Sequence, residues 1–177
     1  MPSSDAGALD APTHSPVVSD TSPLVHLSRV GLFSLLETFY GRLLIPPAVW
    51  REAVEEGRGR VGEAEVRAAA GWIDIRTPTD TPFLRLLKQE LDDGEAEGIA
   101  LASEVGADLI VVDEAPARKS ARAAGLRVTG TLGILIRAKS EGYLDALRPV
   151  LDRLRLESFR ISDVLYIRVL KGVGEEP

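Results

Sequence analysis

The sequence has no cysteine, which excludes disulfides, cysteine-ligated zinc, iron–sulfur clusters and thiol catalysis. Its two histidines, His14 and His26, stand far apart in unrelated contexts, so a histidine-rich metal site is not expected. Apolar runs stay well short of the roughly 20 residues that a membrane-spanning helix needs. The first sixteen residues lack the basic and apolar regions of a signal peptide. We therefore expect a cytoplasmic protein with no membrane partner.

The overall charge is low and its distribution is uneven. The 177 residues are 45% hydrophobic and 27% charged, which fits one globular domain, and the net charge of -6 by itself argues against strong nucleic-acid binding. Residues 86–114 carry nine acids against one base, whereas residues 115–140 carry six bases and no acid. This pattern suits a metal site beside a surface that holds a polyanion, although two ordinary solvated faces would look the same.

The order of apolar segments predicts an α/β domain. We expect a disordered tail over residues 1–16, a domain over residues 17–172 and a flexible tail over residues 173–177. Short strands are expected at residues 16–19, 43–45, 72–75, 108–112 and 126–128, with helical patterns between them. Such alternation predicts a parallel sheet of about five short strands with helices on both faces, followed by a helical C-terminus. Ser22 and Pro23 look like the cap and first residue of the first helix, Asp145 like the cap of the helix that contains Pro149, and Ser162 like the cap of the last helix.

Four acids are placed where such a sheet binds ligands, beyond the carboxyl ends of its strands. Asp20 and Asp113 each follow a strand, Glu52 lies on the helix after the second strand, and Glu95 lies in the first turn of a helix. A carboxylate cluster without histidine or cysteine selects Mg²⁺ or Mn²⁺, and such sites favour phosphoryl or phosphodiester chemistry. Each acid alone has a structural alternative as a turn, cap or surface residue. His26 has no evident partner, so we expect it to be packed or solvated rather than catalytic.

Several blocks of the sequence resemble the PIN-domain family. They are Val-Val-Ser-Asp-Thr-Ser-Pro-Leu-Val (17–25), Leu-Ile-Pro-Pro-Ala-Val-Trp-Arg-Glu (44–52), Asp-Asp-Gly-Glu-Ala-Glu-Gly-Ile-Ala-Leu-Ala (92–102), Leu-Ile-Val-Val-Asp-Glu (109–114) and Val-Thr-Gly-Thr-Leu-Gly-Ile-Leu (128–135). The last block is similar to one branch of prokaryotic PIN-like proteins, close to the toxin ribonucleases of toxin–antitoxin pairs. The resemblance covers about residues 17–172.

The resemblance implies a PIN-like fold and a Mg²⁺- or Mn²⁺-dependent endoribonuclease that cleaves single-stranded RNA, with an antitoxin protein as partner. It further implies that the four acids converge, with three of them holding the metal and Glu52 positioning or deprotonating the attacking water. Ser22 matches a hydroxyl that often touches the metal or its water, and Glu114 stands beside the fourth acid as a possible substitute. The predicted metal ligands are Asp20, Glu95 and Asp113.

Two features lead to further predictions and one to a rival interpretation. Arg118, Lys119 and Arg122 lie on the helix after Asp113 and are expected to hold the RNA backbone. A surplus of apolar positions on short helices favours a homodimer. Val111 and Val112 stand where the family commonly has Thr or Ser, which leaves open a degenerate PIN-like module that binds RNA or protein without cleaving. A metal-dependent phosphatase acting on small phosphates is a third alternative.

Overall fold

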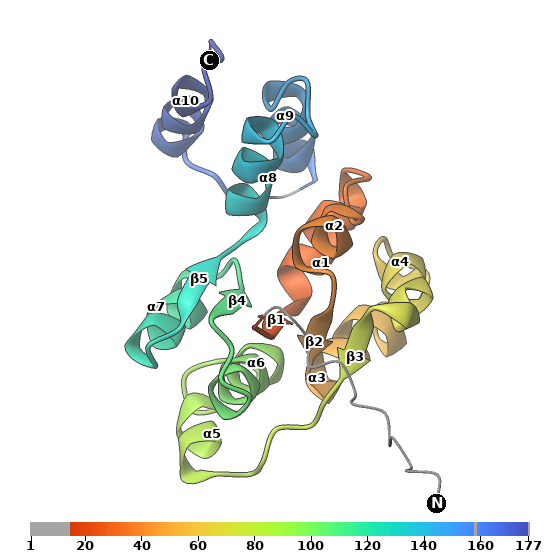
Figure 1. The fold of residues 1–177 in the computed structure, drawn as a ribbon, viewed down its shortest axis with the longest axis vertical. Coiled ribbons are helices and arrows are strands. Elements are labelled where there is room, and N and C mark those ends of the chain that lie inside the picture. The colour runs from red at the N-terminus through yellow and green to blue at the C-terminus, as the bar shows by residue number, and fades with distance from the viewer. Residues whose placement is uncertain (1–14, 158, 177) are drawn as a thin grey trace, which may run out of the picture.

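A computed structural model describes residues 15–157 and 159–176 and shows one parallel sheet with helices around it (Figure 1). The spatial order of its strands is β3-β2-β1-β4-β5, and every neighbouring pair is parallel. The strands are β1 (Val17–Ser19), β2 (Leu43–Ile45), β3 (Ile73–Ile75), β4 (Leu109–Val111) and β5 (Arg127–Thr129). The predicted fold class, an α/β domain with about five short parallel strands and flanking helices, is confirmed.

Helices connect the strands and make up the C-terminal part. The helical elements are α1 (Thr21–Arg29), α2 (Leu35–Tyr40), α3 (Pro47–Trp50), η1 (Arg51–Glu55), α4 (Glu63–Ala68), η2 (Ala69–Gly71), α5 (Pro82–Leu87), α6 (Asp93–Glu104), α7 (Ala115–Ala123), α8 (Thr131–Ser140), α9 (Arg148–Leu156) and α10 (Asp163–Gly172). Of these, η1 is π-helical and η2 is 3₁₀-helical. None of the described helices is long and apolar enough to cross a membrane.

The three central strands β1, β2 and β4 feed two apolar cores because successive side chains point to opposite faces of the sheet. Val17 and Val111 join a core with side chains of α1, α2, α8, α9 and α10, while Val18 and Ile110 join a core with α5, α6 and α7. Both faces of the sheet are therefore covered, as expected for a parallel sheet. The three C-terminal helices α8, α9 and α10 gather at one end of the molecule (Figure 1).

Two predicted helix starts are wrong, and one is confirmed. The cap of α1 is Asp20 rather than Ser22, since the Asp20 carboxylate accepts from the backbone N–H of Ser22 at 3.4 Å. The helix that contains Pro149 begins after Leu147 and not at Asp145, which leaves the proline in the first turn, where no backbone donor is needed. Ser162 caps α10 as predicted, by accepting from the backbone N–H of Leu165 at 3.3 Å.

The two predicted tails differ in how far the structure describes them. Most of the N-terminal tail, residues 1–14, lies outside the described residues. In the segment after α10, the carboxylate of Glu175 accepts from the backbone N–H groups of Leu147 at 2.6 Å and Arg148 at 2.8 Å. These bonds satisfy donors at the start of α9 and tie the end of the described chain to that helix.

Candidate active site

The strand order reverses between β1 and β4, and the candidate site lies at this point. Strand β1 connects onward to β2 on one side, whereas β4 and β5 lie on the other. Ligands of open parallel α/β sheets bind at such a switch point, beyond the carboxyl ends of the strands. Asp20 immediately follows β1, and its backbone N–H donates to the carbonyl oxygen of Val111 in β4 at 2.9 Å. This bond fixes Asp20 between the two central strands.

Asp20, Glu52 and Glu95 come together around the first turn of α6. Gly94 shows how close they are, because a methyl group at this residue would lie 2.9 Å from Glu52 Oε2 and 3.2 Å from Asp20 Oδ1. Glu95 is the next residue, and it is only 6% exposed, while Asp20 is 3% exposed. The structure thus brings three of the four predicted acids to one place, from β1, η1 and α6. We refer to Asp20, Glu52 and Glu95 as the acid cluster.

Thr21 holds Glu52 in the acid cluster. Its hydroxyl donates to Glu52 Oε2 at 2.6 Å, so the first residue of α1 fixes an acid that lies 31 positions further along the chain. Glu52 belongs to the π-helical segment η1, a form that occurs frequently at functional sites. The sequence analysis assigned no role to Thr21 and had no signal for the π-helix.

Burial and mutual repulsion make the acid cluster costly to ionise. Burial, with the nearby charges of Asp92 and Glu95, raises the pKa of Asp20 from 3.8 to about 8. Burial, with the charges of Asp92, Glu114 and Glu52, raises the pKa of Glu95 from 4.5 to about 7. The pKa of Glu52 is also raised, mainly by burial, although the Thr21 hydrogen bond opposes this. A bound cation would relieve this repulsion.

Asp92 is an acid to which the sequence analysis gave no role. Its carboxylate caps α6 by accepting from the backbone N–H of Glu95 at 2.8 Å. Its charge also raises the pKa values of Asp20, Glu52 and Glu95. Asp92 therefore faces the acid cluster, and an exposed carboxylate at its edge could reach a bound cation.

The chemistry of the acid cluster fits a hard divalent metal ion. All its donors are carboxylate oxygens, which Mg²⁺ and Mn²⁺ prefer. No basic side chain is among the causes that shift the pKa of Asp20 or Glu95. Within residues 15–157 and 159–176, no three acid or histidine side chains are already spaced closely enough to hold a metal ion, so binding would require the carboxylates to turn inward.

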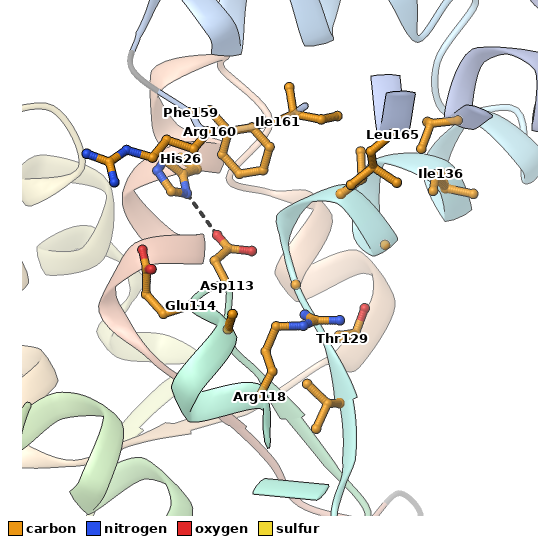
Figure 2. A pocket seen from close by; sticks show the side chains of 16 residues that line it. His26, Asp113, Glu114, Arg118, Thr129, Ile136, Phe159, Arg160, Ile161 and Leu165 are labelled. Atoms are coloured by element: carbon orange, nitrogen blue, oxygen red, sulfur yellow. Dashed lines mark hydrogen bonds and ion pairs between the residues drawn. The ribbon is translucent and has the colours of Figure 1, made fainter. Parts of the chain in front are cut away.

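Asp113, the fourth predicted acid, is bonded to other residues. His26 Nδ1 donates to Asp113 Oδ2 at 2.8 Å (Figure 2). The Thr131 hydroxyl donates to the same oxygen at 2.6 Å, and the Thr131 N–H donates to Asp113 Oδ1 at 2.8 Å. The expectation that His26 has no partner is therefore wrong. Because α1 and β4 meet only in the folded chain, no local pattern around His26 could have shown this pair.

A large cleft begins at Asp113 and extends toward the C-terminal helices. Its volume is about 920 Å³, and it lies between the α7–β5 region and helices α8 and α10. Asp113 and Glu114 both line the cleft, and the Glu114 charge also contributes to the raised pKa of Glu95. Glu114 thus connects the cleft to the acid cluster. No sequence pattern indicates this cleft, because it depends on how α10 packs.

The three basic residues predicted to hold RNA differ in their surroundings. Arg118 is half-buried, and its Nη1 donates to the carbonyl oxygen of Val112 at 2.8 Å. Lys119 and Arg122 are exposed on the outside of α7. Burial and the charge of Arg122 lower the pKa of Arg118 below its ordinary value, which agrees with the two arginines sharing a helix face. The structure therefore keeps two predicted bases at the surface and turns the third toward the cleft.

Other bases of the same stretch have acidic partners from outside it. Arg137 Nε lies 2.7 Å from Glu141 Oε1, and Lys139 Nζ lies 3.4 Å from Glu175 Oε1. These ion pairs reduce the positive region that the sequence predicts over residues 115–140. The part of this region that remains beside the candidate site is the face of α7.

Comparison with known proteins assigns the class and then the family. The structure and the acid cluster define an α/β domain with a candidate hard-metal site. A family model described as "DUF3368: PIN domain" matches residues 16–175, and the chain belongs to this PIN-domain family. The resemblance seen in the sequence is thereby confirmed. PIN domains are a nuclease-type fold family, associated with nucleic-acid binding, that generally uses divalent metal ions.

The other comparisons add little. No curated protein matches the chain. A solved structure of a PilT N-terminus domain protein from the hyperthermophilic archaeon Sulfolobus solfataricus P2 aligns with 69% of this chain and 92% of its own, at 16% identity and a TM-score of 0.48. This is a similarity of the fold, and no functional conclusion depends on it.

Proposed function

We propose that the protein is a Mg²⁺- or Mn²⁺-dependent endoribonuclease that hydrolyses single-stranded RNA, as the toxin of a toxin–antitoxin pair. The observation that supports this most is the acid cluster at the switch point of the sheet. Burying carboxylates together is unfavourable, as the raised pKa values of Asp20 and Glu95 express. A divalent cation offsets that cost, and membership of a nuclease-type family makes an RNA phosphodiester the proposed substrate.

The residues of the acid cluster are assigned different roles. Asp20 and Glu95 are the most buried and are proposed to hold the metal, with Asp92 beside them. Glu52 is half-buried, and the Thr21 hydroxyl fixes one of its oxygens, so its second oxygen is proposed to orient the attacking water. A bound Mg²⁺ or Mn²⁺ supplies an activated water and neutralises charge on the phosphate. Contact of the metal or its water with the Ser22 hydroxyl remains a prediction.

The proposed role of Asp113 is to position His26 and Thr131. The sequence predicts Asp113 as a metal ligand, and this stays a prediction that no observation tests. In the structure both of its oxygens accept hydrogen bonds, so metal binding would require at least one of these bonds to break. Glu114 is exposed, and its side chain makes no capping hydrogen bond to α7. It is the proposed substitute for Asp113 as a metal ligand.

Cleavage of a single-stranded RNA in Mn²⁺, in Mg²⁺ and in EDTA tests the proposal. We expect cleavage with either metal, none in EDTA, and none from the Asp20→Asn variant. Asp108→Asn is the matched control, because Asp108 is exposed and precedes β4 rather than following it. Metal-independent cleavage, or full activity of Asp20→Asn, would show that the acid cluster is not the catalytic site.

A binding module without nuclease activity is the second candidate function. The bonds from His26 and Thr131 to Asp113 support this candidate, because they occupy both carboxylate oxygens of one of the four predicted acids. The same experiment separates the two candidates. If RNA binds with a salt-dependent affinity but stays intact in every metal, the module interpretation holds and the nuclease proposal fails.

The protein partners belong to the proposal as well. A cognate antitoxin and a homodimer are predicted from the sequence. Leu156 on α9 and Val164 on α10 are exposed apolar side chains on which a protein could dock. Light scattering on the purified chain at high micromolar concentration tests self-association, and a strictly monomeric mass would remove the dimer.

A further inference from the structure

The large cleft beside the acid cluster is not needed to hold a metal or a water. Its volume of about 920 Å³ lies in the range of about 300–1,000 Å³ that is common for small-molecule sites. It opens at Asp113 and Glu114, next to the acid cluster, and ends among side chains of α8 and α10. A ligand in the cleft would therefore be adjacent to the proposed site of phosphodiester hydrolysis.

The two walls of the cleft differ in chemistry (Figure 2). One wall is apolar and is formed by Ile136, Ile161 and Leu165, from α8, the loop before α10, and α10 itself. The opposite wall carries the guanidinium of Arg118 and the side chain of Thr129. A flat ring with an apolar face and polar edges matches these two walls, and nucleobases of single-stranded RNA have this character.

Two glycines leave room for the polar side chains of the cleft wall. An added methyl group at Gly133 would collide with the Thr129 hydroxyl oxygen, and one at Gly130 would lie 2.5 Å from Asp113 Oδ1 and 2.9 Å from Arg118 Nη1. Residues with a Cβ atom at these two positions would therefore displace the polar groups that the wall presents to a ligand.

The mouth of the cleft suits a ribose-phosphate rather than a base. His26 lies there, bonded to Asp113 and packed edge-on against Phe159 with ring centroids 4.9 Å apart. Arg160 also lines the cleft and is exposed, and in Figure 2 it lies on the same side of the His26–Asp113 pair as Glu114. A cationic side chain at the mouth of the cleft is placed to contact a phosphate.

We propose that this cleft binds one unpaired nucleotide of the RNA substrate, with the base between the two walls and the neighbouring phosphate at Arg160. This inference rests on the proposed function for the identity of the ligand. It predicts that the protein selects RNA by a base next to the cleavage point, which the acid cluster cannot do.

The test measures binding of a fluorescent single-stranded RNA of about ten nucleotides by anisotropy, in EDTA. The same RNA is then made with one abasic nucleotide, which is moved from position to position. Because enclosure of one base between the two walls contributes to binding, we expect one position at which loss of the base weakens binding about tenfold, or by about 1.4 kcal/mol. Equal binding of every abasic RNA and the parent RNA would overturn the proposal.

A matched pair of variants assigns that effect to the cleft. Leu165 and Ile167 are both on α10 and are 38% and 40% exposed, but only Leu165 lines the cleft. Leu165→Glu should weaken binding of the parent RNA about tenfold and abolish the penalty of the abasic position, whereas Ile167→Glu should behave as the parent protein. If both variants bind RNA like the parent, the apolar wall serves another occupant, such as a protein side chain, and the proposal fails.

The same experiment distinguishes this inference from the proposed nuclease. Binding in EDTA requires no metal and no cleavage, so a base-dependent, Leu165-dependent affinity supports the cleft even if no RNA is hydrolysed. Conversely, metal-dependent cleavage with no effect of the abasic position or of Leu165→Glu would leave the nuclease intact and remove the nucleotide site.

Discussion

Replacing Asp20 by Asn tests the physical basis of the acid cluster more directly than an activity assay. The change removes an ionisable carboxyl that is almost completely buried, while the new amide oxygen can still accept the N–H of Ser22 and cap α1. The variant should therefore fold normally. It should also differ from the parent protein in two measurable ways, namely the pH dependence of its stability and its response to divalent metal.

The pH dependence follows from the raised pKa of Asp20. A carboxyl with a pKa of about 8 in the folded state and 3.8 in the unfolded chain binds its proton more tightly when folded. The free energy of unfolding must then fall as the pH rises from about 4 to about 8, with a limiting slope of about 1.4 kcal/mol per pH unit. The raised pKa of Glu95 acts in the same direction up to about pH 7.

The expected size of the destabilisation depends on the difference between the pH of the assay and the ordinary pKa of an aspartate. At pH 7 the parent protein is about three pH units above 3.8, which limits the destabilisation from Asp20 to about 4 kcal/mol. We expect Asp20→Asn to recover about half of this, or about 2 kcal/mol, since Glu95 and Asp92 remain. A gain of this size raises the melting temperature by about 4–8 °C in a domain of this length. At pH 4 the two proteins should be equally stable.

The assay is thermal unfolding followed by circular dichroism at pH 4, 5.5 and 7, with and without Mn²⁺. Metal at 100 times its dissociation constant should stabilise the parent by about 2.7 kcal/mol and Asp20→Asn much less. Asp108→Asn, an exposed change outside the acid cluster, is the control and should follow the parent. If Asp20→Asn is less stable than the parent at pH 7 and gains as much stability from Mn²⁺, the carboxyl of Asp20 neither destabilises the folded protein at this pH nor holds the metal.

Three further changes probe other parts of the site. Gly94→Ala places a methyl group 2.9 Å from Glu52 Oε2, so it should abolish the Mn²⁺-induced rise in melting temperature, and an unchanged rise would mean that metal binds elsewhere. Thr131→Val removes the 2.6 Å bond to Asp113 and should cost about 1–3 kcal/mol in urea unfolding, with Thr131→Ser restoring most of it. Changing Lys119 and Arg122 together to Ala should reduce the salt slope of single-strand binding by about 1.4, because each phosphate contact contributes about 0.7, without changing stability. A slope equal to that of the parent would place the RNA on another face.

Local pattern determined most of the fold. Five short apolar segments separated by helical ones can bury themselves only as a parallel sheet with helices on both faces, and the structure has this arrangement. The same order of segments placed Asp20 and Asp113 after strands, which was sufficient to find the edge of the sheet where the site lies. The errors in predicting the helices were local. For example, Asp20 and Ser22 lie two positions apart and both can cap a helix, and the structure uses Asp20 as the cap of α1 instead of Ser22.

The details of the site depended on contacts between residues distant in the sequence. Thr21 fixes Glu52 from 31 positions away, and His26 holds Asp113 from 87 positions away. Side-chain hydrogen bonds of this kind have no period and no motif, because they arise from where the helices pack and not from the local chain. For the same reason the sequence showed four equivalent acids, whereas the tertiary structure gathered three of them and bonded the fourth to a histidine. The cleft that ends at α10 likewise exists only because the last helix packs against the sheet's helices.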